Sequence, residues 1–141
     1  MEIYYVLDAS AFINGFKPTS KNNYTVPEIT AEIKDFESRL VYDSAVDDGL
    51  LTVQDVTQEY IDKTDEIISK SGDILRLSFP DKKIIALALM LMDEDKSVKV
   101  ISDDYTIQNT LKIMNIPYSG IITEGIKDIS KGLYFFKIII F

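Results

Sequence analysis

Apolar residues form a few short continuous runs along the chain, and longer stripes at helical spacing lie between them. The run at 3–7 reads Ile-Tyr-Tyr-Val-Leu and leads directly into Asp8. A run of β-branched and aromatic residues without alternation is typical of a strand that is buried on both faces, as in parallel sheets. We therefore predict the first strand at residues 3–8. We predict further strands at 50–56, 98–101 and 116–123.

Helical spacing and N-terminal signals place helices between these strands. Thr25-Val26-Pro27-Glu28 has the pattern of a capping box with proline in the first turn. The apolar residues Ile29, Ile33, Phe36 and Leu40 then predict the buried stripe of one helix that runs to about residue 47. A second predicted opening, Ser78-Phe79-Pro80-Asp81, precedes an almost wholly apolar helix body at 84–92. Further helices are predicted at 57–71 and 105–114.

The predicted elements follow the order β-α-β-α-α-β-α-β. Such alternation indicates an α/β fold, a three-layer α/β/α sandwich with a mainly parallel central sheet and right-handed crossovers. We assign residues 1–126 to this domain and residues 127–141 to a C-terminal tail. The tail ends in the apolar segment 133–141, which is too short to span a membrane. An extra strand, a disordered end and an oligomer contact all stay open for it.

Composition narrows the possible chemistry. The chain contains no Cys and no His, which excludes Ser-His-Asp and Cys-His catalysis and a zinc site built from these residues. Its net charge of −8 argues against binding nucleic acid through bulk electrostatics alone. No signal peptide or membrane span is recognisable, so we expect a cytoplasmic protein without membrane contact.

Acidic side chains recur where predicted strands end and predicted helices begin. Asp8 follows the first strand, and Asp103 and Asp104 follow the strand at 98–101. Asp81 opens a helix, and Glu32 lies on the flank of the stripe at 29 and 33. Each acid also has an ordinary explanation as a helix cap, a turn residue or a surface residue. This explanation is weakest for Asp8, because a charge at the end of a buried strand needs water or a polar partner.

Together these acids indicate a cation site, because like charges at one sheet edge repel each other unless a cation neutralises them. Oxygen-only ligands suit Mg²⁺ or Mn²⁺. Such an ion activates water and stabilises phosphoryl charge, so we expect metal-dependent phosphodiester hydrolysis.

The same segments resemble the PIN-domain nucleases. The resemblance rests on Leu7-Asp8-Ala9-Ser10, Glu32, Asp81 ahead of the apolar run at 84–88, and Ser102-Asp103-Asp104. In that family an Asp-x-Ser motif ends the first strand and a Thr/Ser-x-Asp motif follows the fourth. The resemblance covers residues 3–123 and implies a PIN-like nuclease domain.

Two further segments, 25–29 and 103–109, look like the Nob type of this family. That type is the archaeal and eukaryotic endonuclease that matures the 3′ end of small-subunit ribosomal RNA. Nob-type proteins usually carry a zinc ribbon after the PIN domain, and the absence of Cys departs from that pattern. Single-stranded RNA, in particular pre-ribosomal RNA, and proteins of the pre-ribosomal particle are the expected partners.

The resemblance also implies roles. Asp8, Asp81 and Asp104 would bind one or two Mg²⁺ or Mn²⁺ ions, and Glu32 would complete the set or position the attacking water. Ser10 and Ser102 would hold the carboxylates by hydrogen bonds, and Asp103 would contact a metal through water. The candidates for contacts with the RNA backbone are Lys17, Lys21 and Lys34.

Two alternatives within the family stay open. One is a toxin-type ribonuclease of the VapC class. Two features argue against this alternative, namely the Asp103-Asp104-Tyr105 run and the long predicted first helix. The other is a non-catalytic PIN scaffold, although such domains tend to lose the acids that this chain retains.

Overall fold

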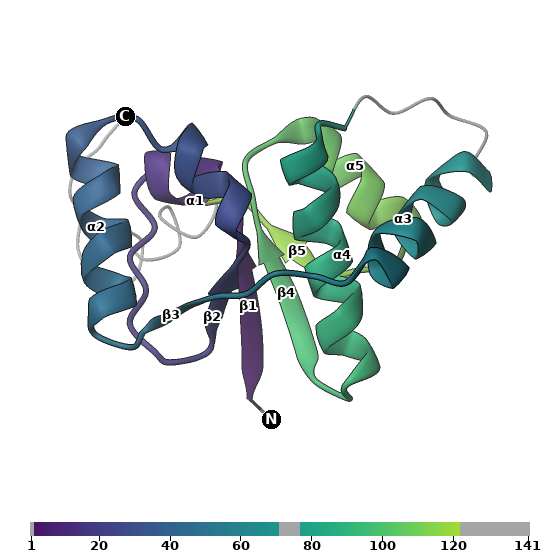
Figure 1. Cartoon of the computed structure of the whole chain (residues 1–141), viewed down its shortest axis with the longest axis horizontal. Coiled ribbons are helices and arrows are strands. Elements are labelled where there is room, and N and C mark those ends of the chain that lie inside the picture. The colour runs from purple at the N-terminus through teal and green to yellow at the C-terminus, as the bar shows by residue number, and fades with distance from the viewer. Residues whose placement is uncertain (1, 71–76, 122–141) are drawn as a thin grey trace, which may run out of the picture.

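A five-stranded, wholly parallel sheet forms the centre of the molecule (Figure 1). The computed structural model describes residues 2–70 and 77–121. The strand order is β3-β2-β1-β4-β5, so β1 is central. The strands are β1 (Ile3–Leu7), β2 (Asn23–Thr25), β3 (Leu51–Val53), β4 (Ser97–Ile101) and β5 (Tyr118–Ser119). Leu7 pairs with Ile101, which places the ends of β1 and β4 side by side.

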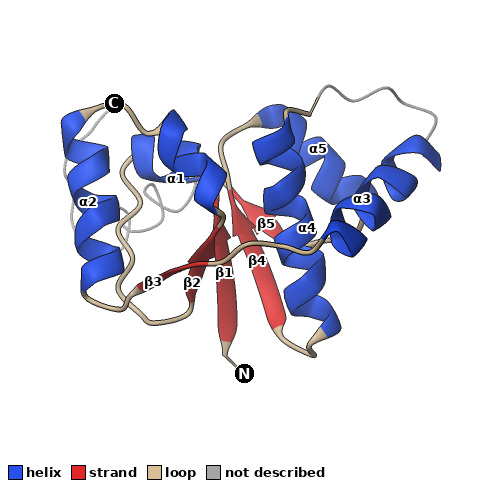
Figure 2. Cartoon of the chain, viewed as in Figure 1, coloured by secondary structure: helices blue, strands red, loops and turns tan. Residues whose placement is uncertain are grey.

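Helices lie on both sides of the sheet, as Figure 2 shows. The helices α1 (Ala9–Ile13) and α2 (Phe36–Asp47) pack together, with the 3₁₀ helix η1 (Pro27–Glu32) against α1. On the other side, α3 (Gln58–Lys70), α4 (Phe79–Asp93) and α5 (Tyr105–Ile113) pack through α4, which contacts β1 and β4. The three-layer α/β/α fold with a parallel sheet is therefore confirmed.

The apolar body of α4 forms the centre of the core. Its residues at 84–88 and 90–91 are buried, as the continuous apolar run predicts. Ser78 caps this helix and Asp81 completes a capping box, so the predicted opening is correct. This helix therefore fixes Asp81 relative to the central strands.

The single helix predicted from Thr25 to residue 47 is wrong. Thr25 belongs to β2, and its Oγ1 donates to the Leu7 carbonyl at 2.6 Å instead of capping a helix. The chain forms η1 after it and starts α2 anew at Asp35, whose side chain accepts from the Ser38 N–H. Phe36 and Leu40 are 79% and 54% exposed, so the predicted stripe ends with the buried Ile29 and Ile33. Residues 23–47 therefore form a strand, a 3₁₀ helix and an α-helix in place of one long helix.

Other element boundaries also differ from the predictions. Helix α1 was not predicted, because Asp8 ends the strand and caps a helix of only five residues. Strand β2 was not predicted because it has only three residues and begins with Asn23. Strands β3 and β5 are shorter than the predicted 50–56 and 116–123.

Within the described ranges no helix is long and apolar enough to cross a membrane. The predicted helix end at residue 71, the domain boundary at 126 and the tail at 127–141 lie outside the described residues.

Candidate active site

Asp8 lies at the centre of a hydrogen-bond network at the carboxyl edge of the sheet. Its Oδ1 accepts from Ser10 Oγ at 2.6 Å and from the Ala11 N–H at 3.1 Å, and its Oδ2 accepts from Ser102 Oγ at 2.6 Å. The residue is only 5% exposed. Burial raises the pKa of this carboxyl from 3.8 to about 6, although the three hydrogen bonds oppose the shift. The site thus holds an acid that is costly to ionise.

The two serines connect Asp8 to the segment that follows β4. Ser10 Oγ accepts from the Asp103 N–H at 2.9 Å, and Ser102 Oγ accepts from the Asp104 N–H at 3.0 Å. Each hydroxyl therefore donates to the carboxylate and accepts from a backbone amide, so its proton has a defined direction. This pattern fixes the position of the two strand ends relative to each other.

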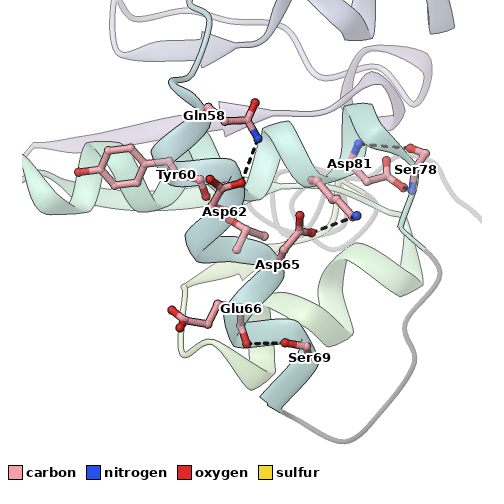
Figure 3. A network of polar contacts seen from close by, with 10 residues as sticks. Gln58, Tyr60, Asp62, Asp65, Glu66, Ser69, Ser78 and Asp81 are labelled. Carbon is pink, nitrogen blue, oxygen red and sulfur yellow. Dashed lines mark hydrogen bonds and ion pairs between the residues drawn. The ribbon is translucent and has the colours of Figure 1, made fainter.

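Asp104 and Asp81 both lie at the N-terminal end of a helix. Asp104 caps α5, where its Oδ1 accepts from the N–H groups of Thr106 (2.8 Å) and Ile107 (3.1 Å). Asp81 Oδ2 accepts from the Ser78 N–H at 3.3 Å in the capping box at the start of α4 (Figure 3). Within the described part of the chain, the second oxygen of each carboxylate accepts no hydrogen bond, so it stays available to a ligand.

Glu32 is the last residue of η1 and is exposed. Its carboxylate makes no hydrogen bond or ion pair with any residue of the described ranges. Partial burial raises its pKa, and the charges of Asp81 and Asp104 raise it further. Burial likewise raises the pKa of Asp81, with a smaller contribution from Asp104. The acids therefore influence each other electrostatically.

One pocket of about 430 Å³ collects these side chains. The residues that line it are Asp8, Ala9, Ser10, Ile13, Ala31, Glu32, Lys34, Asp81 and Asp104. The structure thus brings the four predicted acids together from four segments of the chain. Their catalytic and metal-binding roles stay predictions.

The donor set of the pocket suits a hard divalent cation, since it consists of carboxylate and hydroxyl oxygens. Among the described residues, however, no three acids are close enough to form a ready-made metal site. The residues fit Mg²⁺ or Mn²⁺ in chemistry, in raised pKa values and in the unused oxygens of Asp81 and Asp104.

The remaining predicted residues differ in their position. Asp103 does not line the pocket, because its carboxylate accepts from Asn14 Nδ2 at 2.7 Å and from the Ile121 N–H at 2.8 Å. Lys34 lines the pocket, whereas Lys17 lines two other pockets and the exposed Lys21 does not line the acidic pocket. Of the three lysines, only Lys34 is placed to meet a ligand of the acids.

Sequence reasoning missed two residues that support the site. Gln108 Nε2 donates to the Ser102 carbonyl at 2.6 Å, which holds the segment between β4 and α5. Thr25 Oγ1 donates to the Leu7 carbonyl, directly before Asp8. The Thr25 bond joins two neighbouring strands 18 residues apart along the chain, and the Gln108 bond closes the turn between β4 and α5 over six residues. Neither spacing belongs to a helix or strand pattern that the sequence signals.

Comparison with known proteins agrees with this geometry. The profile described as the PIN domain of ribonuclease matches residues 5–91, a segment that includes Asp8, Glu32 and Asp81. A Methanothermobacter thermautotrophicus protein named Endoribonuclease Nob1 is 48% identical over 123 residues, which cover 87% of this chain and 71% of that protein. The chain belongs to the PIN-domain ribonuclease family.

Two further relatives show how the likeness is distributed in this family. Endoribonuclease Nob1 of Methanocaldococcus jannaschii is 39% identical over 84% of this chain and 57% of its own length. Ribonuclease VapC1 of Thermoplasma acidophilum is 30% identical over 92% of this chain and 62% of its own length. This PIN-domain chain is thus similar to Nob-type proteins and, at lower identity, to a VapC-type protein, and it spans only part of each.

Proposed function

We propose that this chain is an endoribonuclease that hydrolyses RNA phosphodiesters with the help of Mg²⁺ or Mn²⁺. The observation that carries the proposal is the pocket in which Asp8, Glu32, Asp81 and Asp104 meet. Membership of a ribonuclease family and the names of the relatives support the same reaction.

Each residue of the pocket has a proposed role in this reaction. Asp8, Asp81 and Asp104 would hold one or two ions, and Ser10 and Ser102 keep the Asp8 carboxylate in a fixed orientation. A bound ion supplies charge stabilisation for the phosphoryl group and lowers the pKa of water.

Glu32 is the proposed proton acceptor from the attacking water. Its carboxylate is exposed, has no hydrogen bond within the described residues, and has a raised pKa. A carboxylate whose pKa is raised toward the working pH is a more effective general base.

The proposed substrate is single-stranded RNA, in particular the 3′ end of small-subunit pre-ribosomal RNA. Similarity to two proteins named Endoribonuclease Nob1 favours this substrate. Because the chain carries a net charge of −8, its own attraction for RNA is weak, and proteins of the pre-ribosomal particle in the cytoplasm are the proposed source of additional affinity.

Incubation of the protein with a single-stranded RNA that spans this 3′ end tests the proposal. We expect cleavage with Mn²⁺, none with EDTA, and none by the Asp104→Asn variant. Asp95→Asn is the matched control, because Asp95 is exposed, lies outside the pocket and has a positive φ of 63° that Asn also tolerates. Cleavage that persists in EDTA would refute the metal-dependent mechanism.

A VapC-type ribonuclease is the second candidate, favoured by the match to Ribonuclease VapC1. Metal-dependent cleavage of transfer RNA in preference to the ribosomal 3′ end would support it. A non-catalytic scaffold predicts no cleavage of either RNA and no Mn²⁺ binding at millimolar concentration in a calorimetric titration.

A further inference from the structure

A buried lysine lies on the same helix as Asp81 but does not line the acidic pocket. Lys83 belongs to α4, two residues after Asp81, and is only 4% exposed. Its Nζ donates to Glu28 Oε2 at 2.8 Å and also to Asp55 Oδ1. Because a charge with so little access to water needs a close partner, these two carboxylates keep the Lys83 ammonium group paired inside the protein.

The two partners of Lys83 belong to different segments. Glu28 lies in η1, the 3₁₀ helix that ends with Glu32. Asp55 lies between β3 and α3 and is 68% exposed at its side chain. The Lys83–Glu28 pair therefore links the element that carries Glu32 to the element that carries Asp81, whereas the Lys83–Asp55 pair does not.

η1 packs against α1, and only a few specific contacts add to this packing. Its N-terminus has no side-chain cap, and its apolar anchor is Ile29, with Ile33 directly after it. Thr30 Oγ1 and Tyr42 Oη lie 2.9 Å apart in a hydrogen bond that joins η1 to α2. Among residues 2–70 and 77–121, Lys83–Glu28 is the one ion pair between η1 and α4.

Replacement of a buried ion pair by apolar side chains of similar size is often neutral or stabilising, so net stability alone does not account for the Lys83–Glu28 pair. We propose that Lys83 is a positioning residue that sets the separation of Glu32 from Asp81 by clamping η1 to α4 through Glu28. This inference rests on the proposed metal-dependent function of the pocket. It assigns Lys83 and Glu28 to the support of the cation site, although neither lines the pocket.

Two alanine variants separate this role from a general contribution to folding. Glu28→Ala removes the link to η1 and leaves Lys83 paired with Asp55, and Asp55→Ala does the reverse. Each variant removes one carboxylate from the same buried ammonium group, so they are matched in chemistry. Glu28→Gln, which keeps an acceptor for Lys83, is the conservative variant.

Calorimetric titration with Mn²⁺ in the absence of RNA provides the main readout. We expect Glu28→Ala to weaken Mn²⁺ binding about tenfold, the lower end for residues that support metal ligands. Asp55→Ala should match the wild type, and Glu28→Gln should recover part of the affinity. In cleavage assays, Glu28→Ala should raise the Mn²⁺ concentration needed for half-maximal rate and leave the rate at saturating Mn²⁺ near that of the wild type.

Hydrogen exchange of the backbone amides at 28–33 in metal-free protein is a second readout. Faster exchange in Glu28→Ala than in Asp55→Ala supports the clamp, and equal effects of the two variants in both measurements overturn it. Absence of Mn²⁺ binding by the wild type would overturn the proposed function, and the metal-free exchange would then still decide whether Lys83 holds η1 against α4.

Discussion

Replacement of Asp8 by Asn should stabilise the metal-free protein while it abolishes catalysis. The Asp8 carboxyl has a pKa of about 6 in the folded chain and 3.8 as the ordinary value, because burial disfavours its charged form. At about 1.4 kcal/mol per pKa unit, ionisation of Asp8 costs the folded state about 3 kcal/mol above pH 7. Asn has the same shape and no charge, so it avoids this cost.

The hydrogen bonds of Asp8 reduce the expected gain. Asn offers one acceptor oxygen, so one of the two serine hydroxyls must turn to a new partner, at a cost of about 1 kcal/mol. We therefore expect Asp8→Asn to raise the free energy of unfolding by about 2 kcal/mol at pH 8.

The pH dependence gives the decisive test. A raised carboxyl pKa makes the folded state bind the proton more tightly than the unfolded state, so wild-type stability rises as the pH falls through about 6 toward 3.8. The advantage of Asp8→Asn should therefore disappear by about pH 4.

Urea unfolding in EDTA at pH 8, 6 and 4 measures this difference directly. Addition of Mn²⁺ should then stabilise the wild type and not the variant, since ligands that bind only the folded state raise its stability. A stability difference that stays constant from pH 8 to pH 4, or a variant that is less stable at pH 8, would refute the assignment of a charged, desolvated Asp8.

Three further substitutions test other parts of the fold. Ser102→Ala removes a hydrogen bond that lowers the pKa of Asp8, so that pKa should rise and the acidic limb of the pH–rate profile should move to higher pH. Gly120→Ala would place a Cβ 2.6 Å from Asp103 Oδ1 and disturb its bond to the Ile121 N–H, which should cost about 1 kcal/mol in urea unfolding. Ile85→Ala should cost about 2–5 kcal/mol in the same assay because the side chain is fully buried in α4; a loss below about 1 kcal/mol would contradict this packing.

The sequence predicts those parts of the fold in which one signal dominates. The unbroken apolar run before Asp8 correctly predicts a strand, although only Val6 and Leu7 in it are fully buried. The apolar run of α4 could also be a strand, but its Ala, Leu and Met residues and its N-terminal signals favour a helix, which is correct. The stretch after Thr25 allows two interpretations, because a capping-box pattern also fits a strand followed by a 3₁₀ turn. Tertiary contacts decide there, since the Thr25 hydroxyl bonds to the Leu7 carbonyl in the neighbouring strand.

In the candidate site, too, some features are predictable from the sequence and others depend on tertiary contacts. Convergence of the acids is predictable because parallel strands all end at one edge of the sheet. The bond between Asn14 and Asp103 and the pair between Glu28 and Lys83 were not predicted, because the partners lie 89 and 55 residues apart along the chain. The family motif already favoured Asp104 over Asp103, and Asp104, unlike Asp103, lines the pocket.

Asp8 and Asp104 also serve as the N-caps of α1 and α5. Asn and Ser cap helices about as well as Asp, so either residue can replace these acids without loss of the capping bond. Evolution therefore has a short route from this fold to an inactive copy that still folds. A descendant that has lost its catalytic function while keeping a binding role would be expected to carry Asn or Ser at these two positions, whereas random decay would also admit apolar residues.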